Sequence, residues 1–322
     1  MPITVQFATN RALTGPAEDW RSYDTGLVSP SSPAGMQYGT AFVNEVGLTA
    51  DSVGAITSIQ DPHAGGFSDA AAADLGGAGR NLLIFIHGFD NSFEAAITRA
   101  AFVREWLAAS GEGEADTSVV AFCWPSEGRL LDPLMPDWPY RSDQVAAGQS
   151  AAAIMAFFAI LQPILDEARS NGSRVFLIAH SMGNLALQAA VESWFSHGNG
   201  DALLFDEVFL AAADERFDSF AFPRDGRLSG LHRLTPRVTI LFSEADNVLR
   251  VSFGLNGTRR MGQSGPQARF DTDRFPPSLY SMLDCTGYRD FPFGFASSHQ
   301  YYRRSPAVRG LIAAAMSRPR PA

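Results

Sequence analysis

Ser181 stands in the segment R-V-F-L-I-A-H-S-M-G-N (residues 174–184), where an apolar run meets a turn of small residues. The β-branched and aromatic residues of the run predict a buried strand, and the periodicity of Leu185–Phe195 predicts a helix. A strand, a tight turn and a helix lift a serine hydroxyl clear of a sheet for nucleophilic attack, and the turn needs small residues at positions −2 and +2. Ala179, in place of the usual glycine, and Gly183 meet that need. Ser181 is therefore our candidate nucleophile, with a plain turn and a capping serine as the alternative.

A serine nucleophile needs a histidine as its base and an acidic group that orients the histidine. Three histidines follow Ser181 in the chain, namely His197, His232 and His299. His197 lies in the polar segment H-G-N-G-D, which is typical of a surface turn. His232 precedes a predicted strand and would lie at the opposite end of the sheet. His299, in F-A-S-S-H-Q-Y-Y beyond the last predicted strand, remains as the candidate base.

The acid that would orient His299 has more than one candidate. Asp246 directly follows the strand-like run R-V-T-I-L-F, at the carboxyl end of a sheet where sites assemble. The expected chain order is serine, acid, histidine, and the position of Asp246 after the later strand favours it. Asp214, one predicted strand earlier, is the runner-up, and Glu244 is a weaker third choice. Each could instead be a helix cap or a solvated loop charge.

Acyl transfer also requires donors for a developing oxyanion. The backbone N–H of Met182, directly after the nucleophile, would supply one donor. The segment I-F-I-H-G-F-D after an earlier strand suggests Phe89 N–H as the second, with Gly88 allowing the backbone close to the substrate. We group His87, Gly88 and Trp124 as substrate-binding candidates, although a histidine at a strand end is equally explained by structure alone.

The elements that must position these residues alternate along the chain. Strand and helix patterns in turn predict a mainly parallel sheet with helices on both faces, preceded by two strands that look antiparallel. We expect a helix from near Asn91, with Asn91 and Glu94 spaced as a capping box, another from about Asp143 to Ser170 divided at Pro163, and a last one from Ser305-Pro306. Residues 65–79 look like a long surface loop. The predicted strands are Ile3–Ala8, Tyr38–Val46, Asn81–His87, Ser118–Trp124, Arg174–His180, Glu207–Ala213, Arg237–Phe242 and Ser278–Asp284.

Composition excludes several classes of function. The 322 residues are 46% hydrophobic and 18% charged with a formal net charge of −9, which suits a folded chain and argues against a nucleic-acid partner. Neither Cys123 nor Cys285 has a C-x-x-C partner, and no histidine pair has metal-ligand spacing, so we expect no metal and no cofactor. The most apolar stretch, Ala151–Leu165, is interrupted by Gln162-Pro163 and predicts a buried helix rather than an integral membrane segment. No signal peptide is visible, which favours a cytoplasmic location.

Three segments together carry a resemblance to a known family. I-F-I-H-G-F-D-N-S-F-E, F-C-W-P-S-E-G and L-I-A-H-S-M-G-N resemble the α/β-hydrolase superfamily and, more narrowly, an uncharacterised bacterial family of unknown function within it. F-A-T-N-R near the N-terminus and R-M-G-Q-S-G-P also resemble that family. The resemblance implies an α/β-hydrolase fold and a serine hydrolase with Ser181, Asp246 and His299 at its site.

We therefore expect one α/β-hydrolase domain over residues 1–322, with lid or rim inserts at about 125–142 and 250–296. The expected activity is that of a carboxylic ester hydrolase on a small-molecule substrate with an apolar group. Phenylalanines before His299 would form an aromatic wall, although ordinary packing explains them equally well, and Arg259 and Arg260 look like a solvated pair. The alternatives are an acyltransferase or perhydrolase with the same three residues, and a catalytically dead scaffold used for binding. The aromatic positions are Phe253, Phe270, Phe275, Phe291, Phe293 and Phe295.

Overall fold

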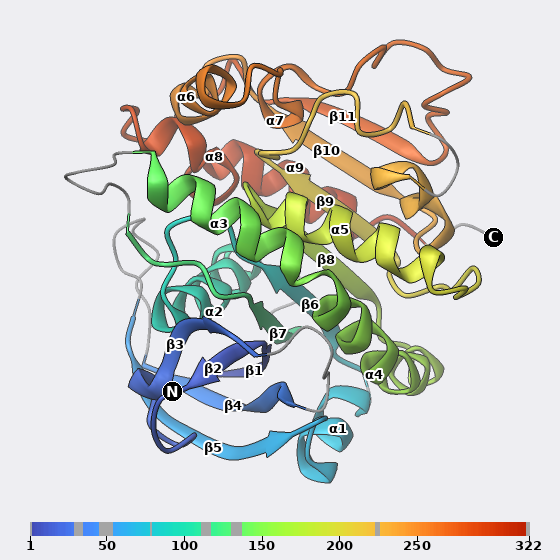
Figure 1. Cartoon of the computed structure of the whole chain (residues 1–322). Coiled ribbons are helices and arrows are strands. Elements are labelled where there is room, and N and C mark those ends of the chain that lie inside the picture. The colour runs from blue at the N-terminus through green and yellow to red at the C-terminus, as the bar shows by residue number, and fades with distance from the viewer. Residues whose placement is uncertain are drawn as a thin grey trace.

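A nine-stranded sheet runs through the computed structural model of the chain, with strand order β11-β10-β9-β8-β6-β7-β1-β4-β5 (Figure 1). The structure describes residues 2–28, 35–44, 54–77, 79–110, 117–129, 137–222 and 226–319. Strands β6 to β11 are parallel to their neighbours, and β1 is parallel to β7. Strand β4 pairs antiparallel with β1, and β5 pairs antiparallel with β4 at the edge of the sheet. The strands of this sheet are β1 (Ile3–Thr9), β4 (Gln37–Val43), β5 (Ile56–Ala64), β6 (Asn81–Ile86), β7 (Thr117–Cys123), β8 (Val175–His180), β9 (Glu207–Ala211), β10 (Val238–Phe242) and β11 (Tyr280–Asp284). A separate hairpin pairs β2 (Arg11–Leu13) with β3 (Tyr23–Leu27).

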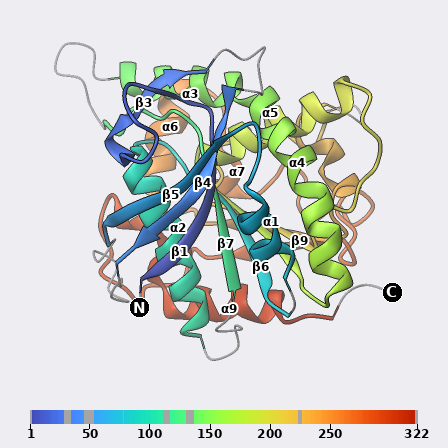
Figure 2. The same ribbon diagram turned by 90° about the horizontal axis from the view of Figure 1, so that it is seen from below.

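Helices cover both faces of this sheet, as predicted (Figure 2). One face packs against α1, α3, α4 and α5, and the other against α2, α8 and α9. The central strands are buried on both sides and therefore consist of almost uninterrupted apolar residues. The helices are α1 (Asp69–Gly76), α2 (Phe93–Ala108), α3 (Trp138–Gln149), α4 (Ala151–Ser170), α5 (Gly183–Ser196), α6 (Asn247–Asn256), α7 (Met261–Ser264), α8 (Tyr301–Arg304) and α9 (Pro306–Met316), with short 3₁₀ turns at Trp20–Ser22, Arg227–Arg233 and Ser297–His299.

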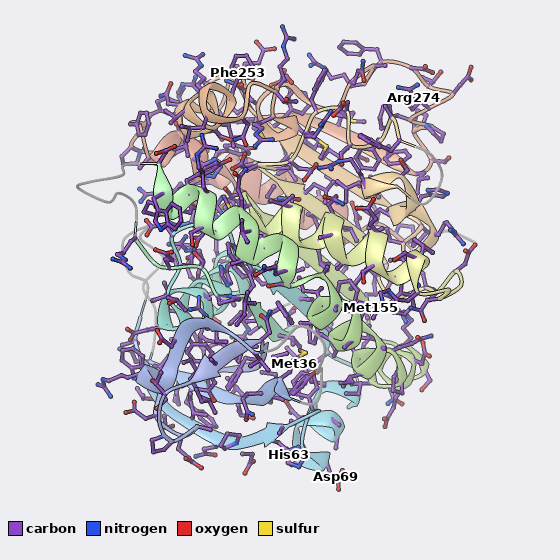
Figure 3. All side chains as sticks on the ribbon, viewed as in Figure 1. Met36, His63, Asp69, Met155, Phe253 and Arg274 are labelled. Atoms are coloured by element: carbon purple, nitrogen blue, oxygen red, sulfur yellow. The ribbon has the colours of Figure 1, made fainter. Side chains whose placement is uncertain are left out.

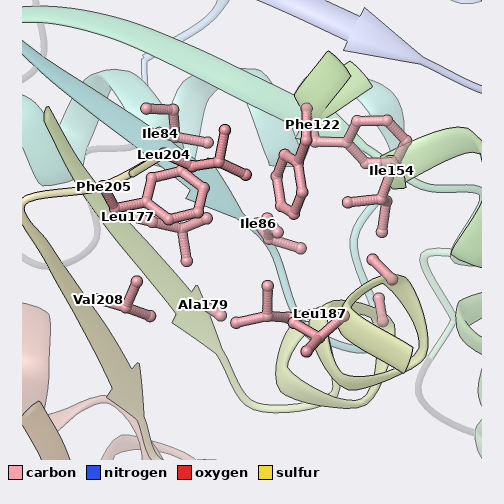
Figure 4. Close-up of a cluster of buried hydrophobic side chains, with 14 of the residues drawn as sticks. Ile84, Ile86, Phe122, Ile154, Leu177, Ala179, Leu187, Leu204, Phe205 and Val208 are labelled. Atoms are coloured by element: carbon pink, nitrogen blue, oxygen red, sulfur yellow. The ribbon is translucent and has the colours of Figure 1, made fainter. Parts of the chain in front are cut away.

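The core on the α4–α5 face fixes the direction of the strand that carries the nucleophile. Leu177 and Ala179 of β8 point into it, beside Ile84 and Ile86 of β6 and against Leu187 of α5 (Figure 4). Burying a large aliphatic side chain contributes about 1.5–3 kcal/mol. A one-residue slip of β8 would exchange its two faces, so this packing determines which way the chain leaves the strand.

Several sequence expectations need correction. The long helical region breaks at Ser150 and not at Pro163, which lies inside α4. Residues 65–79 are not simply a loop, since they contain α1. Strand Ile3–Ala8 is antiparallel to β4 but parallel to β7. Helix α2 is capped by Ser92, whose side chain accepts the Ala95 N–H, and not by Asn91.

The two expected inserts have different outcomes. Of residues 125–142, the part from 130 to 136 lies outside the described residues, and the described end begins α3. Residues 250–296 are not one loop, because they include most of α6, all of α7 and strand β11 of the sheet. Whether either segment opens as a lid stays a prediction.

Helix α4 is continuous over 20 residues with a mean hydropathy of 1.5, so by length and composition alone it could cross a membrane. Its apolar side chains, among them Ile154, Phe157, Phe158 and Leu161, are buried against the sheet and α5. These contacts are those of a buried helix, as the sequence predicted.

Candidate active site

Ser181 follows β8 directly and has a left-handed backbone with φ of 53°. This conformation costs a non-glycine residue about 1–2 kcal/mol. Hydrogen bonds on both sides of the turn hold it. The Ser181 N–H donates to Ala211 O and the Asp214 N–H donates to Ser181 O, both at 3.0 Å. The buried side chain of Asn184 donates to Ala179 O at 2.9 Å and to Ser181 O at 3.0 Å. The turn is therefore rigid, and α5 begins two residues after the serine.

Glycines bring a second loop against this turn. A Cβ on Gly183 would lie 2.5 Å from His87 O and 2.6 Å from Ile86 O, and one on Gly88 would lie 2.7 Å from the Ser181 Cβ. Neither position has room for a side chain. Ala179 does have room for its Cβ, which is fully buried in the core. The loop of residues 87–91, after β6, is thus in direct contact with the turn that carries Ser181.

Asp246 and His299 form a direct pair at this edge of the sheet. Asp246 Oδ2 lies 2.6 Å from His299 Nδ1, and both side chains are buried. The second carboxylate oxygen accepts the Leu249 N–H at 3.0 Å, so Asp246 is also the N-cap of α6. Because one oxygen is held by the helix, the other is fixed in direction toward the imidazole.

The other ring nitrogen of His299 is available for chemistry. Its Nε2 is buried and has no hydrogen-bond partner among the described residues. The ring packs against His180, the neighbour of Ser181, with 4.9 Å between ring centroids, and His180 Nε2 lies 3.4 Å from His299 O. Hence the 3₁₀ turn Ser297–His299 docks beside the end of β8, where the serine lies.

Asp214, the runner-up acid, has other partners. Its carboxylate accepts hydrogen bonds from Tyr140 Oη at 2.9 Å and Ser252 Oγ at 2.5 Å, and forms an ion pair with Arg260 Nε at 2.9 Å. Arg260 is only 5% exposed, so the expected solvated arginine pair is wrong for this member. This buried cluster ties α3 to α6, and His299 is not among the partners of Asp214.

The expected oxyanion donors have backbone N–H groups free of competing bonds. Among the described residues, neither Phe89 N–H nor Met182 N–H donates a hydrogen bond to another group. Met182 is the N-cap of α5, where the helix dipole favours a negative charge. Two cavities among the described residues lie away from these donors. The larger, of about 370 Å³, is lined by Ile3, Thr117 and Ser118 at the amino ends of β1 and β7, opposite the serine.

His87 and Trp124 do not line a surface, contrary to the expectation that they contact substrate. Trp124 is fully buried and stacks on His87 with 5.0 Å between ring centroids, while its indole N–H donates to His87 O at 2.7 Å. His87 Nδ1 lies 2.9 Å from Gly88 O. Both side chains support the 87–91 loop from behind.

The burial of His87 makes the fold sensitive to acid. Burial in the main, with nearby arginines, lowers the pKa of His87 from 6.5 to about 3. The unfolded chain therefore binds one more proton than the folded protein between these values, and stability falls as pH drops below 6.5. We expect His87→Gln to reduce the pH slope of the free energy of unfolding by up to about 1.4 kcal/mol per pH unit. Urea unfolding of both proteins at pH 5 and pH 7 measures it, and equal slopes would contradict this account.

Other expected aromatic residues divide into two groups. Phe275 and Phe291 are buried, and Phe275 packs edge-on against Phe220 and Tyr280. Phe253, on the outer side of α6, is exposed (Figure 3). Phe270, Phe293 and Phe295 are exposed as well. The buried members are ordinary packing, whereas Phe293 and Phe295 lie in the segment that leads to His299.

The sequence interpretation missed three buried polar residues behind the 87–91 loop. Asn91, which we had interpreted as a helix cap, is fully buried, as is Asp143, and Arg11 is 1% exposed. Asn91 and Arg11 stand in H-G-F-D-N and F-A-T-N-R, two segments that resemble the family, but the sequence assigns no role in the loop to either side chain. The signal that the sequence offered was a polar side chain, Asn91 or Arg11, within each of these motifs.

A model of a known protein family agrees with this fold. Residues 71–315 match the family model described as an alpha/beta hydrolase of unknown function (DUF900), and the chain belongs to that family. The α/β-hydrolase class predicted from the sequence is confirmed. Among solved structures, the chain is similar to a hyperthermophilic esterase from the archaeon Pyrobaculum calidifontis, with 11% identity and a TM-score of 0.37 over 88% of this chain and 81% of that one. The curated proteins contain no match.

Proposed function

We propose that this α/β-hydrolase is a serine hydrolase that cleaves carboxylic esters of small molecules. The observation that carries the proposal is a set of three groups at one edge of the sheet: a serine with φ of 53°, a histidine whose ring packs on His180, the residue before that serine, and a buried carboxylate 2.6 Å from the same histidine. Strained backbone of this kind persists where the surrounding structure enforces it, which is typical of active sites.

In the proposed reaction, Ser181 Oγ attacks the ester carbonyl carbon and its proton passes to His299 Nε2. Asp246 holds the imidazole with Nδ1 protonated and stabilises the cation that forms. The N–H groups of Phe89 and Met182 bind the negative carbonyl oxygen of the tetrahedral intermediate. That intermediate expels the alcohol, which takes the proton from His299, and leaves an acyl group on Ser181. Water then repeats the sequence and releases the carboxylic acid.

The exposed Phe293 and Phe295, 39% and 60% exposed, support an apolar group on the substrate. Their segment precedes His299 directly, so an acyl or alcohol chain bound at the site would pass near them. Each methylene that becomes buried contributes up to about 0.8 kcal/mol, or roughly fourfold in kcat/KM.

The test is hydrolysis of p-nitrophenyl esters of increasing acyl length, alongside matched amides and lactones. The proposal expects ester turnover, with kcat/KM rising along the short end of the series and little amide cleavage. Added alcohol or peroxide distinguishes hydrolysis from acyl transfer, because a transferase would divert most of the acyl group to the added acceptor. Absence of turnover on every ester would contradict the proposal.

A further inference from the structure

The side chain of Asn91 binds two carbonyl groups of the 87–91 loop. Asn91 Nδ2 donates one hydrogen to Gly88 O at 2.9 Å and the other to Phe89 O at 2.7 Å. The ring of His87 meets the same Gly88 oxygen at 2.9 Å. Asn91 is 0% exposed, so these bonds form without competition from water.

These bonds fix the direction of the N–H groups that follow. In a trans peptide the C=O and the N–H point to opposite sides of one rigid plane. A Gly88 oxygen turned toward Asn91 therefore turns the Phe89 N–H away from it. The next peptide behaves the same way, since Phe89 O faces Asn91 while the Asp90 N–H faces Asp143 Oδ2 at 3.4 Å.

We propose that Asn91 is a positioning residue for the oxyanion site, and that Arg11 holds it in place. The inference rests on the proposed function, because it concerns the donor that Phe89 supplies to the intermediate. Donors contribute most when they are oriented before the charge develops. In an unfixed loop, Phe89 N–H would have to be reoriented during the reaction.

Arg11 anchors Asn91 from a distant part of the chain. Arg11 Nη2 donates to Asn91 O at 2.8 Å and to Ser126 O at 3.0 Å, and Nη1 donates to Asp24 O at 3.2 Å. The guanidinium is almost fully buried and forms no ion pair with any carboxylate of the described residues. Burying a charge that only donates hydrogen bonds to backbone carbonyls is costly in free energy. This cost indicates that the several donors of the guanidinium have a specific role in holding these carbonyls.

A second anchor reaches Asn91 from α3. The Asn91 N–H donates to Ser126 Oγ at 3.1 Å, and Ser126 Oγ donates to the buried Asp143. Asp143 Oδ1 also accepts the Glu127 N–H at 2.9 Å. Arg11 on one side and Asp143 on the other thus leave Asn91 a single position.

The test compares Asn91→Ala and Asn91→Asp with the wild type on the best p-nitrophenyl ester. Alanine removes both donors, and aspartate keeps the shape while presenting oxygen to two carbonyls. We expect kcat to fall by about 10- to 10³-fold in both, with KM within about threefold of wild type. A trifluoromethyl ketone, which adds to Ser181 and carries the same oxyanion, should lose affinity by the factor that kcat/KM loses.

Asn81→Ala is the matched control. Asn81 is the first residue of β6, the strand that precedes the 87–91 loop. Its side chain is buried and accepts the Arg174 N–H at 2.8 Å. Its loss should lower stability and leave kcat unchanged. Arg11→Lys, which keeps the charge and loses the fork, should lower kcat in the direction of the Asn91 variants.

The outcomes separate the two proposals. The positioning role alone would be overturned if the wild type hydrolyses esters and the Asn91 variants keep their kcat. Unchanged affinity of these variants for the ketone would overturn it as well. An equal fall of kcat in Asn81→Ala would do the same, since it would reduce the effect to general destabilisation. A wild type without turnover would overturn the proposed function and the positioning role with it.

Discussion

Ser181→Ala is expected to reduce ester turnover by at least about 10⁴-fold, to the level that binding and the oxyanion donors alone provide. Stability should hardly change. Serine and alanine experience a φ of 53° alike, and the backbone bonds to Ala211 and Asp214 remain in the variant. The initial rate of p-nitrophenyl ester hydrolysis and a urea unfolding curve measure the two quantities.

Two variants complete this experiment. Ser196→Ala, at the exposed end of α5, is the control and should keep full activity. Ser181→Gly should be as inactive as the alanine variant yet more stable by about 1 kcal/mol, because glycine adopts the left-handed conformation without strain. Retained turnover in Ser181→Ala would refute the assignment of the nucleophile.

Asp246→Asn is expected to lower kcat by about 10⁴-fold, because an amide no longer holds His299 in the tautomer that leaves Nε2 free to accept a proton. The helix should tolerate this change. Asparagine caps helices as well as aspartate does, so the bond to Leu249 N–H and the start of α6 are preserved. Kinetics should therefore change far more than stability.

Asp214→Asn should show the opposite pattern. It leaves the buried Arg260 without its carboxylate partner, a loss that typically costs about 3–5 kcal/mol in stability. Comparing kcat and urea unfolding for the two variants separates the roles. A larger loss of kcat at Asp214 than at Asp246 would overturn the choice of the acid.

The sequence could predict the sheet because the central strands are buried on both faces and so stand out as apolar runs. Their ends agree with the structure to within two residues, as for Asn81–Ile86 and Glu207–Ala211. Helix boundaries were harder. Pro163 was expected to divide a helix, but packing against the sheet keeps α4 continuous, and tertiary contacts outweigh local propensity there.

The site residues were predictable to the extent that chain order fixes their place. A serine, an acid and a histidine after successive parallel strands must meet at one edge, and Asp246 and His299 lie together there. Which of two acids faces the histidine depends on loop conformation, which no strand pattern contains. The burial of Trp124 and the position of the Asn91 side chain depend on contacts with residues far away in sequence, such as Arg11. Only the folded chain brings these together.

The central claim is that Ser181 is an activated nucleophile, and covalent labelling by a fluorophosphonate tests it most directly. The reagent reacts with a serine that a neighbouring base deprotonates, whatever the natural substrate is. The account predicts stoichiometric labelling of wild type, with the added mass on the peptide containing Ser181, and none in Ser181→Ala. A wild-type protein that remains unlabelled, or one labelled at another serine, would contradict it.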